Sequence, residues 1–333
     1  MLQKTFKALR IHETSTSIFE RRIETCNLAV LPEADVLIKV IYSSLNYKDA
    51  LSASGNKGVT RKYPHTPGID AAGIVEHSLS PAFKPGDEVI VTGYDLGMTT
   101  AGGFGGYIRV PSEWVVPKPA NLTLLESMIY GTAGFTAAIA LRRLQRNGQS
   151  PESGTILVTG ATGGVGSIAV ALLSKAGYNV IASTGKAEET DNLKRLGASE
   201  VIGREEVDDP SGRALLHGRW AGAIDTVGGN TLATVLKSTD VHGSVACCGN
   251  VSSPLLSTTV FPFILNGVSL LGVNSATCPM TERVEIWNLL ASEWKVQLPD
   301  QYIHISSLED MPEWIDMILK GGLTGRVILD HYL

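Results

Sequence analysis

The segment 155–169 has the residue types and spacing that bind a dinucleotide. An apolar run, Thr155–Thr159, leads into three glycines spaced by three, Gly160, Gly163 and Gly166, and a helical pattern follows. Glycines let the backbone approach a pyrophosphate, and the helix N-terminus offers unpaired N–H groups and the positive end of its dipole. Because strand, turn, helix and following strand occur in the required order, we expect dinucleotide binding here. The candidate contacts in this loop are Thr162, Gly163, Gly164 and Val165.

The end of the next predicted strand distinguishes NAD from NADP. Folds that prefer NAD usually place an Asp or Glu there, about 20 residues beyond the glycines, to bind the ribose hydroxyls. This chain has no carboxylate in the segment 182–186. Lys186 attracts a 2′-phosphate, and Arg204 after the third strand offers a second cation, although a solvated lysine at a helix start is the alternative. We therefore predict NADP(H), with contacts from Ser183, Thr184, Gly185, Lys186 and Arg204.

Alternating strand and helix patterns surround this loop. Six strand candidates lie at 155–159, 179–182, 200–202, 223–226, 244–247 and 268–273, with helical patterns such as 164–176 and 188–196 between them. This alternation predicts a parallel, doubly wound sheet. Before residue 121, short apolar runs at 36–42, 73–76 and 87–92 are divided by Gly and Pro, which favours a barrel-like β domain.

The remaining helices are indicated by capping and periodicity. Thr123 and Glu126 have the capping-box spacing, so we expect a helix to begin there. A second helical pattern, 134–144, ends in the basic residues Arg142, Arg143 and Arg146, whose charge suits a helix C-terminus. A further helix is expected at 311–319, followed by a turn and a strand.

Composition excludes several classes of protein. The 333 residues suggest about two domains, and the net charge of −5 argues against a nucleic-acid partner. The four cysteines contain no C-x-x-C pair, so a disulfide scaffold or redox dithiol is not expected. The longest apolar stretch, 260–273, is interrupted and too short to span a bilayer, and no secretory leader is evident. We expect a cytoplasmic protein without a membrane partner.

Several segments together resemble the medium-chain dehydrogenase/reductase superfamily. The shared landmarks are 84–89, 102–107, 131–136 and 160–169. More narrowly, Ser43–Asp49, Pro67–Asp70 and Ala182–Lys186 resemble its zinc-free quinone-oxidoreductase branch of the YhdH/YhfP type, which includes acryloyl-CoA reductases. The resemblance implies an α/β fold: a GroES-like, β-rich catalytic domain from residues 1–122 and 275–333, a Rossmann domain from 123–274, and an active cleft between them.

The same segments argue against a metal. Zinc-containing relatives carry a cysteine in the first segment and Gly-His-Glu in the second, whereas this chain has Asn46, Tyr47 and then Gly68-Ile-Asp70. The four-cysteine structural zinc lobe and any H-x-x-x-H spacing are also absent from the sequence. Zinc needs three or four N, S or O ligands, so we expect no metal site.

The resemblance also implies roles for particular residues. Asn46 and Asp70 would be cleft residues and Tyr47 a cofactor contact. The Asn46 amide would stabilise an enolate, and Tyr47 or water would supply the proton. Asp70 would position a ribose hydroxyl, Lys48 or a water, with a structural carboxylate as the alternative. By motif position, further cofactor contacts would be Cys248, Gly249, Asn250, Ile264, Ser275 and, through a phosphate, Arg326.

A reductase without a Lewis acid needs a substrate that accepts hydride readily, such as an alkene conjugated with a carbonyl. The leading hypothesis is an NADPH-dependent reductase of a short α,β-unsaturated carbonyl, with acryloyl-CoA as the candidate. A CoA ester would need a basic mouth, for which Lys57, Arg61 and Lys62 are candidates, although a solvated loop is slightly favoured. The alternatives are a broad quinone reductase and an NADPH-binding sensor or structural protein. A homodimer is expected through strand 268–273.

Overall fold

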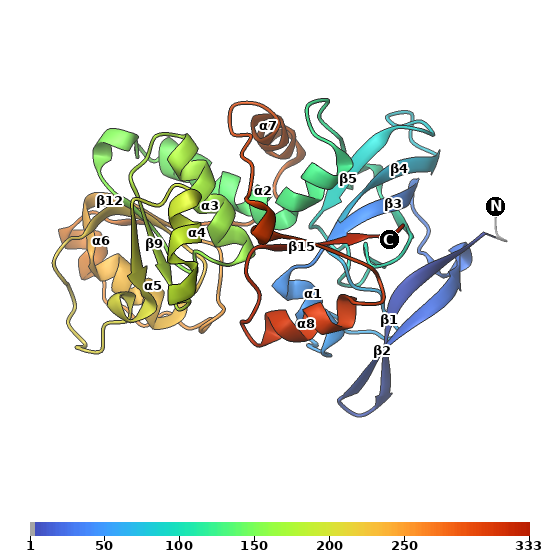
Figure 1. The fold of residues 1–333 in the computed structure, drawn as a ribbon, viewed down its shortest axis with the longest axis horizontal. Helices are drawn as coiled ribbons and strands as arrows, with labels where there is room; N and C mark the ends of the chain where they lie inside the picture. The colour runs from blue at the N-terminus through green and yellow to red at the C-terminus, as the bar shows by residue number, and fades with distance from the viewer. Residues whose placement is uncertain (1–3) are drawn as a thin grey trace. The chain divides into compact units, whose positions relative to one another are not determined.

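The computed structural model describes residues 4–333, which form two compact units (Figure 1). Unit 1 contains the residues up to Thr132 together with Ala276–Ala291 and Asp300–Leu333, and unit 2 contains Ala133–Ser275 and Ser292–Pro299. Segments from both ends of the chain therefore build unit 1, whereas unit 2 comes almost entirely from the middle.

Unit 1 is built on a seven-stranded sheet of order β14-β15-β3-β4-β5-β7, with β6 paired to β3. These strands are β3 (Val36–Ser44), β4 (Asp70–Ser78), β5 (Glu88–Thr92), β6 (Tyr107–Val110), β7 (Val115–Pro117), β14 (Ile303–Ser306) and β15 (Arg326–Asp330). The C-terminal β15 pairs antiparallel with β3, so the end of the chain completes a sheet begun by its first part. β-branched and other apolar residues of these strands form a buried cluster, which stabilises the sheet by removing apolar surface from water.

Unit 1 also contains a hairpin, three whole helices and the first part of a fourth, which continues into unit 2. Strands β1 (Thr5–Ser15) and β2 (Ile18–Asn27) pair with each other as a separate two-stranded sheet. The three whole helices are α1 (Tyr47–Ala53), α7 (Met280–Leu290) and α8 (Met311–Leu319). Helix α8 packs beside α1, and its Met311 and Ile315 belong to a buried cluster with Leu45 and Val327. This cluster holds the start of α1 against the C-terminal strand.

Unit 2 contains a six-stranded parallel sheet of order β10-β9-β8-β11-β12-β13. The strands are β8 (Ile156–Val158), β9 (Val180–Thr184), β10 (Glu200–Gly203), β11 (Trp220–Asp225), β12 (Thr239–Cys247) and β13 (Ser269–Gly272). Numbered along the chain this order is 3-2-1-4-5-6, the doubly wound order of dinucleotide-binding folds. All six predicted strands are present, and the predicted α/β fold with a parallel Rossmann sheet is confirmed.

Helices α3 (Gly164–Lys175), α4 (Thr190–Arg195), α5 (Gly229–Lys237) and α6 (Phe261–Leu265) alternate with these strands. The core beneath them includes Leu157, Trp220, Val235 and Val245, all at most 1% exposed. Continuous apolar strands of this kind are expected when a parallel sheet is covered on both faces.

Helix α2 (Leu124–Arg146) joins the two predicted helical segments into one element with a break at Gly131 (φ 50°, ψ −155°). It begins with the predicted capping box: the N–H of Glu126 donates to Thr123 Oγ1 (3.0 Å), and the N–H of Thr123 donates to a Glu126 carboxylate oxygen (2.7 Å). Within residues 4–333, α2 is the one helix long and apolar enough to cross a membrane. However, 72% of its most apolar window is buried inside the protein.

Candidate active site

The glycine loop between β8 and α3 is held in a shape that only glycine permits at two positions. Gly160 has φ +60°, and a Cβ there would lie 2.4 Å from Thr226 Oγ1. A Cβ on Gly166 would lie 2.2 Å from the carbonyl oxygen of Gly160, so α3 packs directly on the turn. The first N–H groups of α3 have no partners within the helix and are available to an anion. This backbone arrangement fits the diphosphate of a dinucleotide.

The loop is joined to the end of the neighbouring strand β9. Thr162 Oγ1 lies 3.3 Å from Thr184 Oγ1, and the N–H of Ala161 donates to the carbonyl of Ser183 (3.0 Å). The side chains of Ser183 and Thr184 are buried, at 1% and 5% exposure. Thr184 Oγ1 also accepts the N–H of Lys186 (3.0 Å). The Thr184 hydroxyl therefore fixes the turn after β9, and the Ser183 carbonyl joins the strand to the glycine loop.

Two cationic side chains remain accessible at this strand end. Lys186 is half-buried, and Arg204 is exposed, with its side chain lying against Gly185. An ideal Cβ on Gly185 would be 2.9 Å from Arg204 Cδ and 3.3 Å from Nη1. Burial lowers the pKa of Lys186, while Glu189 and Glu188 raise it. The structure thus brings Arg204 beside the 182–186 segment, a donor set that suits a 2′-phosphate.

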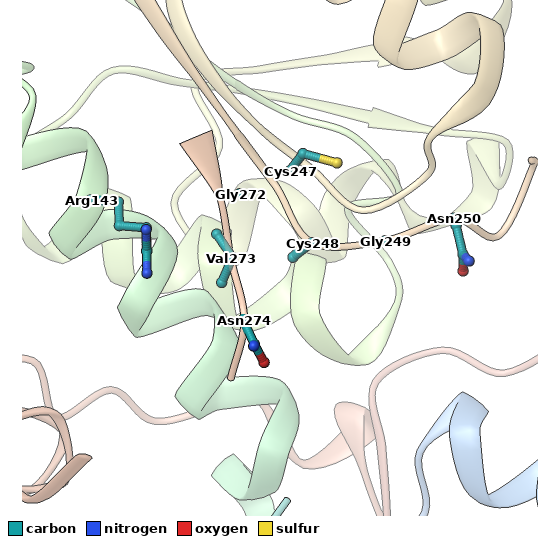
Figure 2. Close-up of a pocket in the computed structure, with 8 residues that line it drawn as sticks. All are labelled: Arg143, Cys247, Cys248, Gly249, Asn250, Gly272, Val273 and Asn274. Carbon is teal, nitrogen blue, oxygen red and sulfur yellow. The ribbon is translucent and has the colours of Figure 1, made fainter. Parts of the chain in front are cut away.

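Residues 248–250, which were predicted to line the cofactor, lie together in a pocket of about 660 Å³ (Figure 2). Cys247 and residues 272–274 at the carboxyl ends of β12 and β13 also line it, with Arg143 from α2. Two other predicted contacts lie outside its lining. Ile264 is 67% exposed on α6, and Ser275 Oγ accepts a hydrogen bond from Thr136 Oγ1 (2.8 Å).

Asp70 is the centre of a buried polar cluster in unit 1. Its Oδ2 accepts hydrogen bonds from Ser44 Oγ (2.6 Å), Asn46 Nδ2 (2.8 Å) and the N–H of Thr132 (2.8 Å), and its Oδ1 accepts one from Thr132 Oγ1 (2.5 Å). Asp70 itself is fully buried. Because of this burial, its carboxylate oxygens are not exposed to a ribose or a solvent water. The geometry favours the structural alternative, a carboxylate that positions its neighbours.

Asn46 is held by Asp70 at the start of α1. Its Nδ2 also donates to the carbonyl of Ser44 (3.2 Å), so both amide hydrogens have partners within the protein. This geometry argues against the predicted role of the Asn46 amide as an enolate donor, because such a donor needs a free hydrogen. Tyr47 is the next residue and is half-buried. Within residues 4–333 its hydroxyl forms no hydrogen bond.

Gly131 is the residue that allows α2 to reach Asp70. A Cβ there would lie 2.5 Å from Ser44 Oγ, 2.6 Å from Asp70 Oδ2 and 2.9 Å from Arg326 Nη2. The break at Gly131 turns the N–H of Thr132 toward Asp70, away from the helical partner four residues earlier. Ser44, Gly131 and Thr132 were not predicted as site residues. The signals for them were the family landmarks that contain them, Ser43–Asp49 for Ser44 and residues 131–136 for Gly131 and Thr132.

The predicted role of Arg326 as a phosphate contact is not supported, because its guanidinium lies in the interior of unit 1. It is 2% exposed, its Nε donates to the carbonyl of Ile129 (3.0 Å), and its Nη1 donates to the carbonyl of Leu45 (3.3 Å). Burial lowers the pKa of Arg326, and the charges of Asp70 and Asp49 oppose that shift. Arg326 therefore holds backbone segments together and does not face an external ligand.

Asp49 caps α1 from within. It accepts the N–H groups of Asn46 (2.8 Å), Gly68 (3.1 Å) and Ile69 (2.8 Å). Burial first, and then the negative charge of Asp70, raise the pKa of Asp49 to about 7. Asp49 thus ties the segment 67–70 to the start of α1, next to Asn46 and Tyr47.

The remaining chemistry-bearing side chains show no sign of activation. Burial raises the pKa of the thiols of Cys247 and Cys248, so both are held protonated. Across residues 4–333, three or more His, Cys, Asp or Glu side chains do not gather anywhere in an arrangement that could hold a metal ion.

Comparison with known proteins agrees with this architecture. Residues 32–120 match the alcohol dehydrogenase GroES-like domain, and residues 164–292 match the zinc-binding dehydrogenase family. YhfP of Bacillus subtilis (strain 168), which is named as a quinone oxidoreductase, is 48% identical over 97% of this chain and 98% of its own. Its NAD-bound crystal structure matches with a TM-score of 0.93 over 98% of this chain and 99% of that one.

Two further relatives are similar over nearly their whole length. The acrylyl-CoA reductase AcuI of Ruegeria pomeroyi is 42% identical over 92% of this chain and 93% of its own. The YhdH oxidoreductase of Salmonella enterica, crystallised with NADP, is 40% identical, with a TM-score of 0.94 over 97% of this chain and 99% of that one. This chain therefore belongs to the medium-chain dehydrogenase/reductase superfamily, in the group that contains YhfP, YhdH and AcuI.

Proposed function

We propose that this chain is an NADPH-dependent reductase that delivers hydride to the β-carbon of a short α,β-unsaturated carbonyl compound, with acryloyl-CoA as the favoured substrate. The proposal rests on the charged side chains at the end of β9. Lys186 and Arg204 lie there, and the strand end has no carboxylate. A carboxylate there would favour NAD, whereas two cations favour the 2′-phosphate. The relatives named for acrylyl-CoA reduction and crystallised with NADP support it.

The residues of unit 2 bind and orient in this proposal. When bound, NADPH supplies the hydride, and the protein supplies orientation and charge. The N–H groups at the start of α3 hold the diphosphate, Lys186 and Arg204 hold the 2′-phosphate, and residues 248–250 line the rest of the cofactor. Ile264 and Ser275 keep their proposed place near the nicotinamide, which follows from motif position alone.

The residues of unit 1 position a donor. Asp70 fixes the Asn46 amide, and Asn46 fixes the first turn of α1, which carries Tyr47. Because both Asn46 amide hydrogens are engaged, we assign contact with the substrate to the Tyr47 hydroxyl. That hydroxyl stabilises the developing negative charge on the carbonyl oxygen or passes a proton to the α-carbon. Asn46 and Asp70 are then positioning residues.

Reduction of quinones is the second candidate, and one observation favours it. A CoA ester would be helped by a basic mouth at Lys57, Arg61 and Lys62. Lys57 instead forms an ion pair with Glu13 (2.6 Å) and lies over the rings of Phe19 and Tyr63. Of these three residues, Arg61 and Lys62 are exposed and form no ion pair with any of the residues 4–333. The predicted cluster of three thus offers two available cations.

The test follows NADPH absorbance with acryloyl-CoA, crotonyl-CoA, a simple enone and benzoquinone, with NADH in parallel. We expect the highest kcat/KM with acryloyl-CoA and NADPH. Replacing Arg204 by Gln should raise KM for NADPH about tenfold and leave KM for NADH nearly unchanged, since only NADPH carries the 2′-phosphate. Tyr47→Phe should lower kcat with every acceptor. Equal kcat/KM with NADH and NADPH, or faster turnover with quinones than with any enone, would contradict the leading function.

We also propose a homodimer and a cytoplasmic location. β13 is an edge strand of its sheet, and Leu270 on it is 37% exposed. Phe261, Ile264 and Leu265 of the preceding α6 are 43–67% exposed. An apolar edge strand with apolar neighbours is a surface that proteins usually cover, and pairing of β13 with a second copy would cover it.

A further inference from the structure

His331 follows the last strand of unit 1, and its ring donates a hydrogen bond to a distant loop. The backbone N–H of His331 donates to the carbonyl of Ile41 on β3 (3.1 Å), which fixes the residue to the sheet. The ring Nε2 lies 2.8 Å from the carbonyl oxygen of Gly103. Because a carbonyl oxygen only accepts, Nε2 carries the hydrogen in this bond. Burial lowers the pKa of His331, and the bond to Gly103 and the charge of Asp330 oppose that shift.

The loop 102–104, which accepts this bond, lies directly against the segment that ends in Asp70. The N–H groups of residues 102–104 donate to the carbonyls of residues 66–68 (2.8–3.0 Å). A Cβ on Gly103 would lie 2.1 Å from the backbone oxygen of Asp70 and 2.7 Å from Ser43 Oγ. Since no side chain fits between the loop and Asp70, a displacement of Gly103 is passed on to the neighbouring segment.

The same segment is tied to the first turn of α1 through Asp49. The N–H groups of Gly68 and Ile69 donate to one Asp49 carboxylate oxygen (3.1 and 2.8 Å), and the N–H of Asn46 donates to the other (2.8 Å). Tyr47 follows Asn46 and begins α1. Hydrogen bonds within unit 1 therefore connect the end of the chain to the first turn of α1.

We propose that His331 is a positioning residue for the reduction, which acts through Gly103 on the start of α1. This role rests on the proposed function, which gives the substrate contact to the Tyr47 hydroxyl. One hydrogen bond between neutral groups contributes little to the stability of a whole fold, whereas a misplacement of about 1 Å can cost about 100-fold in rate. His331 therefore affects kcat more than it affects folding.

The first test compares His331→Leu, which removes the donor, with His331→Gln, whose amide nitrogen can still donate to Gly103. Tyr332→Leu is the control from the same chain end, because Tyr332 is 59% exposed and lies over the ammonium of Lys39 (5.1 Å). We expect His331→Leu to lower kcat for acryloyl-CoA at saturating NADPH about tenfold, and the other two variants to stay within about twofold of the original protein. The Kd for NADP+ should change by less than about twofold in all three, since its proposed phosphate contacts belong to unit 2.

The second test needs no turnover. Hydrogen–deuterium exchange, read by mass spectrometry, reports how often the amides of residues 68 and 69 lose their bonds to Asp49. We expect exchange at residues 66–70 to be about tenfold faster in His331→Leu, to return to normal in His331→Gln, and to be unchanged in the unit 2 strand β8 in both. If His331→Leu does not fold, His331→Asn replaces it, because its shorter amide cannot reach Gly103.

Three outcomes would overturn the positioning role. They are unchanged exchange at residues 66–70 without the donor, equally faster exchange in β5 and β8, which would indicate general loosening of the fold, and failure of His331→Gln to restore kcat. A protein that reduces neither enones nor quinones would refute the proposed function instead. The exchange measurements would then still decide whether His331 holds the segment 66–70.

Discussion

Asp70 shows how a single buried carboxylate can fix the groups around it. Ser44, Asn46 and Thr132 all donate to it, and it is fully buried. A buried carboxylate is tolerated when hydrogen bonds satisfy its oxygens, and the groups that donate are then fixed in orientation. Asp70 thereby determines the orientation of the Asn46 amide and, through it, the start of α1.

Gly131 is the residue whose replacement should damage this cluster most directly. Gly131→Ala introduces a Cβ 2.5–2.6 Å from Ser44 Oγ and Asp70 Oδ2, at a positive φ. We expect the free energy of unfolding to fall by about 3 kcal/mol, from backbone strain and overpacking together. Chemical denaturation measures it. Gly148→Ala is the control, because Gly148 also has positive φ but open space around it, and it should cost only about 1 kcal/mol. Equal losses would exclude crowding as the cause.

Asp49 should give the stability of the protein a measurable pH dependence. Its folded pKa is raised to about 7, above the ordinary value of 3.8, because of burial and Asp70. The folded chain therefore keeps a proton that the unfolded chain releases. The stabilisation that this proton gives the folded state is fully present below pH 3.8, the ordinary pKa of the group. It is lost as the pH rises to about 7.

Asp49→Asn cannot titrate, so the stability difference between the original protein and the variant isolates this contribution. We expect the free energy of unfolding of the original protein, minus that of the variant, to fall between pH 4 and pH 7 and to become constant above pH 7. Urea unfolding at fixed ionic strength over that range measures it. A difference that stays constant with pH would show that Asp49 is already ionised at pH 4.

At the scale of elements, the glycine turn and α3 behave as one unit. The close approach of Gly166 to the Gly160 carbonyl means that Gly166→Ala must separate the helix from the turn. We expect NADP+ to bind at least about tenfold more weakly, a loss of about 1.4 kcal/mol, because the N–H groups no longer converge on the diphosphate. Gly322→Ala is the control outside the loop, because a Cβ there would have its nearest contact, Met317 Cγ, at 3.3 Å. Fluorescence titration with NADP+ would contradict the expectation if both variants bound alike.

The elements of unit 2 were predictable because their signals are local. Each strand is a short apolar run followed by a helical pattern, and the glycine spacing identifies the first turn. The hairpin of β1 and β2 was not predicted, because apolar and polar residues do not alternate strictly along its two strands. The interior position of Arg326 was not predictable either. An arginine at the start of a terminal strand gives no sign that backbone carbonyls of Ile129 and Leu45 surround it.

At the scale of the whole molecule, the exposed apolar edge of unit 2 leads to a test of assembly. Leu270→Lys places a charge on β13, where the proposed pairing with a second copy would bury it. We expect the mass in solution, measured by light scattering, to change from dimer to monomer at micromolar concentration. Leu79→Lys is the control, because Leu79 is a 73% exposed leucine of unit 1 and should leave the dimer intact. A monomeric unmodified protein would contradict the pairing.

The pairing of β15 with β3 sets an order of events on the ribosome. Residues 36–132 emerge before residue 326, so the sheet of unit 1 lacks β15, and the carbonyls of Leu45 and Ile129 lack Arg326, until residues 326–330 have been translated. At about 5–20 residues per second, the nascent chain waits about 10–40 seconds between Thr132 and Arg326. During that interval unit 2, which is nearly contiguous, can complete its sheet. Throughout that interval, the edge of β3 that pairs with β15 in the finished sheet stays unpaired.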